Sequence, residues 1–442
     1  MRRHRNNLRH GLRRGSRHNW EQGVVITLVA VFMLVVVGAM AALSIDVVTF
    51  YTARSEAQLA ADSAALAAAR VLANSAATSD STGTLMALAQ TPAQNVALQV
   101  AGQNQVGGMT VASGQVTVTV AFNVANPTDP TVTVTVQVPK LPTFFARMLG
   151  TKFVAVAAWA TAEAYNPTGT GAGGAKPVAP TCVKPWLLPN KDPSNGGKPI
   201  FDTTSGAVTG ASNLLGWYST LPATPLLMDV NCPGGDCSGA LPAPSQWQYY
   251  PGNDDPTSFP HPTNSLPTCS LIPTLTDYQK SVVGCVQTSL ACNSNKVNID
   301  LSPYTTRTSE TADAVNCLTH ATVTGGGDTV TSTTTTANPP TAPFEFIAGA
   351  GNPIPGLVAG TTRVMVSDSL VTVPVFDSTA TTNPVQIIGF VQLFLNPAGS
   401  ASATGINTTV INLAGCGTGA IGTTPIYGNG ASPVAVRLIS SP

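Results

Sequence analysis

Cysteine and histidine are the residue types in this chain whose spacing could support chemistry. Cys317-Leu-Thr-His320 has a C-x-x-H spacing that zinc sites use, and Cys232 and Cys237 are separated by four residues. No paired C-x-x-C motif accompanies them, which favours disulfide bonds over zinc. His261 and His320 are candidate general bases, but no G-x-S-x-G, H-E-x-x-H or P-loop motif supplies a partner. The sequence therefore predicts no catalytic, metal-binding or cofactor-binding residue, and no enzyme.

The cysteines are instead predicted to form disulfide bonds. All eight lie at or after Cys182, and an oxidising compartment would pair an even number of them. Cys232 with Cys237, or Cys285 with Cys292, would each close a short loop, but the spacing leaves the connectivity open. The predicted disulfide cysteines are Cys182, Cys232, Cys237, Cys269, Cys285, Cys292, Cys317 and Cys416.

Charge is distributed very unevenly along the chain. The totals balance, with 21 Lys and Arg against 21 Asp and Glu, but seven arginines and no acid lie in residues 1–17. Acidic residues are in excess after Gly23, which argues against nucleic-acid binding by the main body. A basic run before an apolar segment indicates a cytoplasmic N-terminus, whereas the alternative is a tail that binds RNA without specificity.

That apolar segment is long enough to cross a membrane. Residues 24–45 contain no charge, and at ~1.5 Å per residue a helix of this length spans ~33 Å. A cleaved signal peptide would use Ala39-Met40-Ala41, but the apolar run continues beyond it. A type IV prepilin leader would need a Glu five residues after Gly23, where Leu28 stands. We therefore expect a retained anchor.

The helix is predicted to continue beyond the membrane, because residues 46–73 contain no glycine or proline. A ladder of small side chains follows one face at a spacing of four residues, which lets another backbone approach closely. The strip would pack either on a sheet of its own chain or against another subunit in a shared stalk. Its members are Ala53, Ala57, Ala61, Ala65 and Ala69.

The same stretch resembles the N-terminal part of TadG-like proteins of the Flp pilus, or tight adherence, assembly family. The resemblance lies in Gly23 before the apolar span, Asp46 at its exit, and the run Gln58-Leu-Ala-Ala-Asp62-Ser-Ala-Ala-Leu-Ala-Ala-Ala. It covers mainly residues 18–70. It implies an inner-membrane protein with an exported body, linked to other pilus-assembly proteins, and it brings no catalytic residues.

Some TadG-like proteins carry a von Willebrand A domain, whose metal site begins with Asp-x-Ser-x-Ser. Asp377-Ser-Thr-Ala-Thr has a similar form after an apolar run. A helix must follow such a loop, whereas another strand is predicted here within about seven residues, so we expect ordinary turn chemistry.

The predicted fold class is α+β, with a transmembrane helix that extends into a pilin-like domain of one helix and a small antiparallel sheet. The expected parts are a basic cytoplasmic tail at 1–23, a transmembrane helix at 24–45, the helix-and-sheet domain at 46–166, a linker at 167–181, a disulfide-rich irregular region at 182–320, a Thr/Gly-rich linker at 321–343, and an all-β, sandwich-like domain at 344–442.

These features predict a structural, non-enzymatic component of Flp/Tad pilus assembly or of a related adhesion apparatus. It would cross the bacterial inner membrane once, with its body in the periplasm or outside the cell. It would contact pilus-assembly proteins or a second copy through the alanine-rich helix. The alternative is an exported enzyme or ligand-binding protein that uses a TadG-like anchor, which a pocket with convergent polar groups in 182–320 would favour.

Overall fold

A computed structural model describes the chain from residue 19 onwards, with gaps. The arginine-rich tail, Cys232, Cys237, Cys269 and His261 lie outside the described residues. The described ranges are 19–80, 82–123, 126–169, 176–192, 195–209, 214–215, 226–230, 248–252, 274–292, 296–299, 307–333, 340–379, 384–397, 401–402, 405–416, 423–427 and 432–440.

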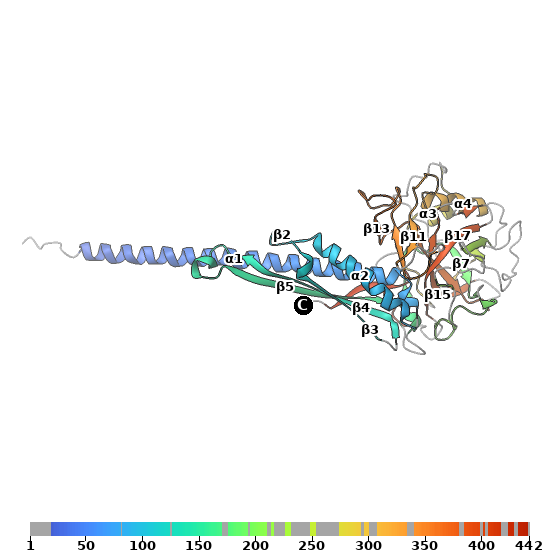
Figure 1. The fold of residues 1–442 in the computed structure, drawn as a ribbon, viewed down its shortest axis with the longest axis horizontal. Coiled ribbons are helices and arrows are strands. Elements are labelled where there is room, and N and C mark those ends of the chain that lie inside the picture. Colours follow the sequence, from blue (N-terminus) through green and yellow to red (C-terminus); the bar gives the residue numbers. More distant parts are fainter. Residues whose placement is uncertain are drawn as a thin grey trace, which may run out of the picture.

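One long helix, α1 (Asn19–Asn74), leads into the broad part of the molecule that contains a closed mixed sheet and that we call the head (Figure 1). Its 56 residues correspond to about 84 Å at 1.5 Å per residue. Residues 39–73 contain neither glycine nor proline and are rich in alanine, the strongest helix former. The backbone hydrogen bonds therefore continue well past residue 45, where the apolar span ends.

The second half of α1 and helix α2 cover one face of an antiparallel sheet and together form a stalk (Figure 1). Among the described strands the order is β19-β5-β4-β3. Val132, Val134 and Val136 of β4 are fully buried, whereas the threonines between them are partly exposed, as a half-buried strand requires. The elements are α2 (Thr84–Gly102), β3 (Val116–Asn123), β4 (Asn126–Pro142), β5 (Phe153–Tyr165) and β19 (Ala435–Ser440).

The alanine strip of α1 is the surface that meets this sheet. Its five members and Ala60, Ala64 and Ala68 between them are all at most 1% exposed. They share one hydrophobic core with the inward valines of β4 and the alanines of β5 and α2. The intramolecular alternative is therefore confirmed. Self-association through the alanine-rich helix stays a prediction, and the strip itself is covered by the chain's own sheet and α2.

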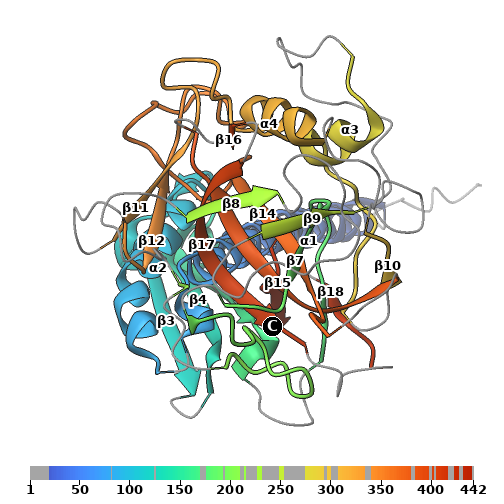
Figure 2. The ribbon, with the colours of Figure 1, turned by 90° about the vertical axis from the view of Figure 1, so that its right-hand side faces the viewer.

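The head is built on a mixed sheet that closes on itself (Figure 2). Its order among the described strands is β10-β15-β14-β7-β9-β8-β17-β16, and β15 also pairs with β17, so that the pairings from β15 to β17 form a ring. Closure hides strand edges that would otherwise invite pairing with another chain. The strands are β7 (Trp186–Pro189), β8 (Leu226–Val230), β9 (Gln248–Pro251), β10 (Lys296–Val297), β14 (Leu370–Phe376), β15 (Val385–Leu395), β16 (Ala401–Ser402) and β17 (Gly405–Gly415).

Smaller elements surround these two parts. Trp186, Phe201 and Tyr278 are fully buried in the core of the head, to which two short helices contribute. The helices are α3 (Asp277–Val283) and α4 (Arg307–Leu318), with 3₁₀ turns at Ala77–Ser79, Ser113–Gln115, Ala146–Leu149 and Pro167–Gly169. The remaining strands are β1 (Gln105–Val106), β2 (Met109–Thr110), β6 (Val178–Ala179), β11 (Thr329–Ser332), β12 (Phe344–Ile347), β13 (Arg363–Val364) and β18 (Ile426–Tyr427).

Buried polar side chains join the stalk to the head. At the end of α1, Asn74 accepts a hydrogen bond from Gln392 of β15 at 3.2 Å, and Asn412 of β17 donates to Gln392 at 2.6 Å. Asn166, just after β5, donates to the carbonyl of Leu413 at 2.9 Å, and all four polar residues are at most 4% exposed. A buried amide without a partner costs about 1–3 kcal/mol, so this network holds the two parts in one arrangement.

The structure differs from the predicted division of the chain in three places. The regions 182–320 and 344–442 do not form separate parts, because β7, β9 and β8 from the first and β14, β15 and β17 from the second pair within the same closed sheet. The C-terminal strand β19 leaves the head and joins β5 of the stalk. Both predicted linkers contain packed elements, since β6 lies within 167–181 and β11 within 321–343. Strand pairing between residues far apart in sequence overrides the boundaries that Gly/Pro composition suggests.

The packing of the alanine strip predicts that enlarging one of its members destabilises the protein. Ala61→Leu should lower the free energy of unfolding by about 1–3 kcal/mol, because the site has no room for a larger side chain. Thermal unfolding of the full chain in detergent micelles measures the loss. Ala67→Leu, at a half-buried position of the same helix, is the matched control. Equal stability of the two variants would contradict close packing at Ala61.

Candidate functional site

The first half of α1 is exposed and apolar, which makes it the clearest candidate for a functional segment in the described chain. Residues 23–45 are exposed almost throughout, with Val24 at 65% and Leu34 at 76%. Within the described part of the chain, this is the one helix long and apolar enough to cross a membrane. A Cβ added at Gly23 would meet no atom within 4 Å outside the neighbouring backbone of its own helix, so this glycine has no packing role among the described residues.

Asp46, the first charged residue after the apolar span, ties α1 to another part of the fold. Its Oδ1 accepts a hydrogen bond from the backbone N–H of Phe144 at 2.9 Å, and its Oδ2 accepts from Phe145 at 3.0 Å and Ala146 at 2.6 Å. These donors open the 3₁₀ turn Ala146–Leu149, where backbone N–H groups lack partners within the turn. Asp46 is 1% exposed, so one carboxylate caps the loop between β4 and β5 from a distant part of the chain.

Asp62, the second acid of the resemblance, has a more local role. It accepts a hydrogen bond from Gln58 of its own helix at 2.7 Å. Gln58 also donates to the carbonyl of Trp159 at 3.1 Å, which ties α1 to β5. The sequence pattern singled out both acids but did not indicate which of them reaches across the fold.

The cysteines of the described residues form disulfides, but not as the shortest spacing suggested. The bonds join Cys182 to Cys285 and Cys292 to Cys416. The proposed loop between Cys285 and Cys292 is therefore wrong, because each pairs with a partner more than 100 residues away. Cys317 is disulfide-bonded as well, which removes the thiolate that a zinc site with His320 would need.

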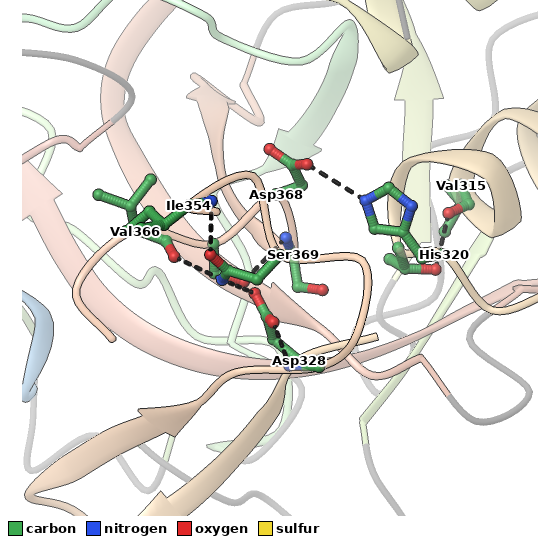
Figure 3. A network of polar contacts seen from close by, with 11 residues as sticks. Val315, His320, Asp328, Ile354, Val366, Asp368 and Ser369 are labelled. Carbon is green, nitrogen blue, oxygen red and sulfur yellow. Dashed lines mark hydrogen bonds and ion pairs between the residues drawn. The ribbon is translucent and has the colours of Figure 1, made fainter. Parts of the chain in front are cut away.

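A second polar cluster lies where three segments of the head meet, residues 320–328, 349–354 and 366–369 (Figure 3). His320 Nε2 lies 3.3 Å from Asp368 Oδ2, and this hydrogen bond raises the pKa of His320 above its usual value. Asp328 accepts from the Gly349 N–H at 2.6 Å and from Asn352 Nδ2 at 2.9 Å. Among the described hydrogen bonds the imidazole of His320 contacts Asp368 alone, so the geometry is that of an oriented ion pair.

Close packing explains the glycines around this cluster. A Cβ on Gly351 would lie 2.5 Å from the His320 ring, and one on Gly349 would lie 2.3 Å from the carbonyl oxygen of Gly327. The Gly-rich run before Asp328 is thus a packed crossing of two backbones.

Nearby, Lys184 donates to the carbonyl of Gly284 at 2.8 Å, and burial lowers the pKa of its amine to about 8.

The described residues do not form a cluster of metal ligands. No three His, Cys, Asp or Glu side chains of this part of the chain gather closely enough to hold an ion. Asp377 accepts hydrogen bonds from the backbone N–H and the hydroxyl of Thr379, at 2.9 and 2.8 Å. A hydrogen bond from a residue to the Asp two positions before it is typical of a local turn.

The comparison with protein families agrees with the position of the exposed helix. Residues 23–71 match the model of the Flp pilus-assembly TadE/G-like family, which includes Gly23, Asp46 and the whole alanine strip. The match is confined to α1 and leaves the sheet and the head unassigned. No curated protein and no solved structure matches the chain.

Loss of the Asp46 carboxylate should free the loop between β4 and β5. In Asp46→Asn the amide cannot accept the same three hydrogen bonds, so the N–H groups of residues 144–146 should exchange with deuterium faster. Hydrogen exchange of the full chain in micelles, read by mass spectrometry, measures this. Asp62→Asn is the control, since it leaves those donors paired. Unchanged protection at 144–146 in Asp46→Asn would contradict the capping role.

The His320–Asp368 pair predicts a pH dependence of stability. Because the pKa of His320 is raised in the folded state, its contribution is fully present below the unfolded value of about 6.5 and is lost as pH rises through the folded value. The melting temperature should therefore fall in that window more steeply in the native chain than in His320→Gln. Parallel curves for the two proteins would contradict the pairing.

Proposed function

We propose that this protein is a membrane-anchored, non-enzymatic structural component of Flp pilus assembly or of a related cell-surface adhesion apparatus. The observation that carries the proposal is the coincidence of three features in α1. The family match at 23–71, the exposed apolar half and the buried alanine half all lie on one uninterrupted helix. An anchor of this kind cannot move relative to the stalk without breaking that helix.

The proposed orientation places the N-terminus in the cytoplasm and the stalk and head on the outer side of the bacterial inner membrane. Arginines cluster before the apolar span, and short basic flanks remain cytoplasmic. The disulfides Cys182–Cys285 and Cys292–Cys416 favour the same orientation, because such bonds persist in oxidising compartments. Both arguments support a location of the stalk and head in the periplasm or outside the cell.

The mechanical role that we propose is that of a strut. Helix α1 and its sheet form one packed core, and the buried amides of Asn74, Gln392 and Asn412 hold the head at its end. A rigid connection of this length holds the head at a fixed distance from the membrane. Its partners are then other pilus-assembly proteins that bind the head or the outer face of the sheet.

Topology and association test this proposal together. A reporter that is active only in the periplasm should give activity when fused after Pro442 and none when fused before Met1, which is the matched control. The protein should remain in the inner-membrane fraction after carbonate washing, and pilus-assembly proteins should copurify with it. Activity of the N-terminal fusion alone, or release of the protein by carbonate, would refute the proposal.

A further inference from the structure

The loop between β4 and β5, together with the first residue of β5, carries three large and exposed apolar side chains. Phe144 is 67% exposed, Met148 85% and Phe153 55%. The neighbouring Phe145 is 39% exposed as well. Large apolar groups gathered on one loop of an otherwise polar, Thr-rich sheet indicate a contact surface.

The position of this loop relative to the membrane is fixed by the chain itself. The three hydrogen bonds from residues 144–146 end on Asp46, which directly follows the exposed apolar span. The helix remains apolar on its exposed side just beyond, with Val48 at 65% and Tyr51 at 79%. The loop therefore lies beside α1 where the apolar span ends (Figure 1). If α1 spans the membrane as proposed, this is the level at which the helix leaves the hydrocarbon.

The charge of the loop suits the same location. Lys140, Arg147 and Lys152 are all exposed, and residues 139–153 contain no acid. Cations beside exposed aromatic and aliphatic side chains are the pattern of segments that lie in the headgroup region of a bilayer. Each cation near an anionic leaflet adds about 1 kcal/mol of attraction, so anionic phospholipids are the favoured partners.

We propose that residues 140–153, which comprise the end of β4, the loop and the first residue of β5, are a second membrane contact of this protein. Phe144, Met148 and Phe153 enter the interface between headgroups and acyl chains, and the three cations contact anionic phospholipid headgroups. This inference rests on the proposed membrane anchoring by α1. Two contacts at one membrane level prevent the stalk from rotating or tilting freely about a single helix, so the loop sets the angle at which the head stands.

Photocrosslinking of the full chain tests the proposal. The photoreactive residue p-benzoylphenylalanine is placed separately at Leu34 in the span, at Met148 in the loop and at Val358 in the head, which is 64% exposed and is the matched apolar control. Each protein is reconstituted in vesicles of phosphatidylcholine and phosphatidylglycerol and illuminated. We expect lipid adducts at Met148 in a yield comparable to that at Leu34, and none at Val358.

The three positions separate failure of this proposal from failure of the anchor. Lipid adducts at Leu34 without adducts at Met148 would overturn the loop contact and leave the anchor intact. Adducts between two copies of the chain at Met148 would overturn it as well, because another protomer would then cover the loop. No lipid adduct at Leu34 would remove the anchor itself. Unchanged mobility on non-reducing gels checks that each variant has folded and formed its disulfides.

The cations beside this contact allow a second, independent test of the proposal. In Arg147→Gln and Lys152→Gln, the preference of the Met148 probe for phosphatidylglycerol over phosphatidylcholine should fall by about fivefold for each cation removed. Lys280→Gln, at a surface cation of the head that pairs with Asp277, should leave the preference unchanged. An unchanged preference in the two loop variants would overturn the headgroup contact.

Discussion

The close approach of α1 to its sheet is the constraint on which the rest of the structure depends. A helix can lie close to a pleated sheet over the roughly 4.7 turns from Ala53 to Ala69 only if its contacting side chains are small, and alanine meets that condition without loss of helix propensity. The strip from Ala53 to Ala69 is fully buried against the valines of β4 and the alanines of β5. The same helix supplies the exposed apolar half, so one continuous backbone carries both the membrane-length segment and the stalk.

Buried polar groups hold the two ends of this packed unit, while its middle is apolar. At one end Asp46 binds three N–H groups of the loop at 144–146, and at the other Asn74 joins the network of Gln392 and Asn412. Apolar packing alone tolerates sliding along a uniform alanine surface, because one alanine resembles the next. Directional hydrogen bonds to buried groups remove that freedom, since a shifted register would leave them unpaired.

The head achieves its shape by pairing strands that lie far apart in the sequence. Strands β7, β9 and β8 come from the Pro- and Cys-rich part, and they complete a ring with β14, β15 and β17 from the C-terminal part. The disulfides Cys182–Cys285 and Cys292–Cys416 each close a loop of more than 100 residues. Long closed loops restrict the unfolded chain strongly, which suits a fold whose core depends on such distant contacts.

The sequence by itself determined the elements whose signals are local. Residues 24–45 contain no charge, so the span followed from composition. The alanines recur every four residues and the Val/Thr alternation around Val134 repeats every two, so the long helix and the small antiparallel sheet followed from periodicity. Only the tertiary structure decided what those elements meet. The partners of Asp46, the pairing of Cys285, and the return of β19 to the stalk join residues about 100 or more positions apart. No local pattern encodes such contacts, because they are selected by the burial and hydrogen bonding of the whole chain.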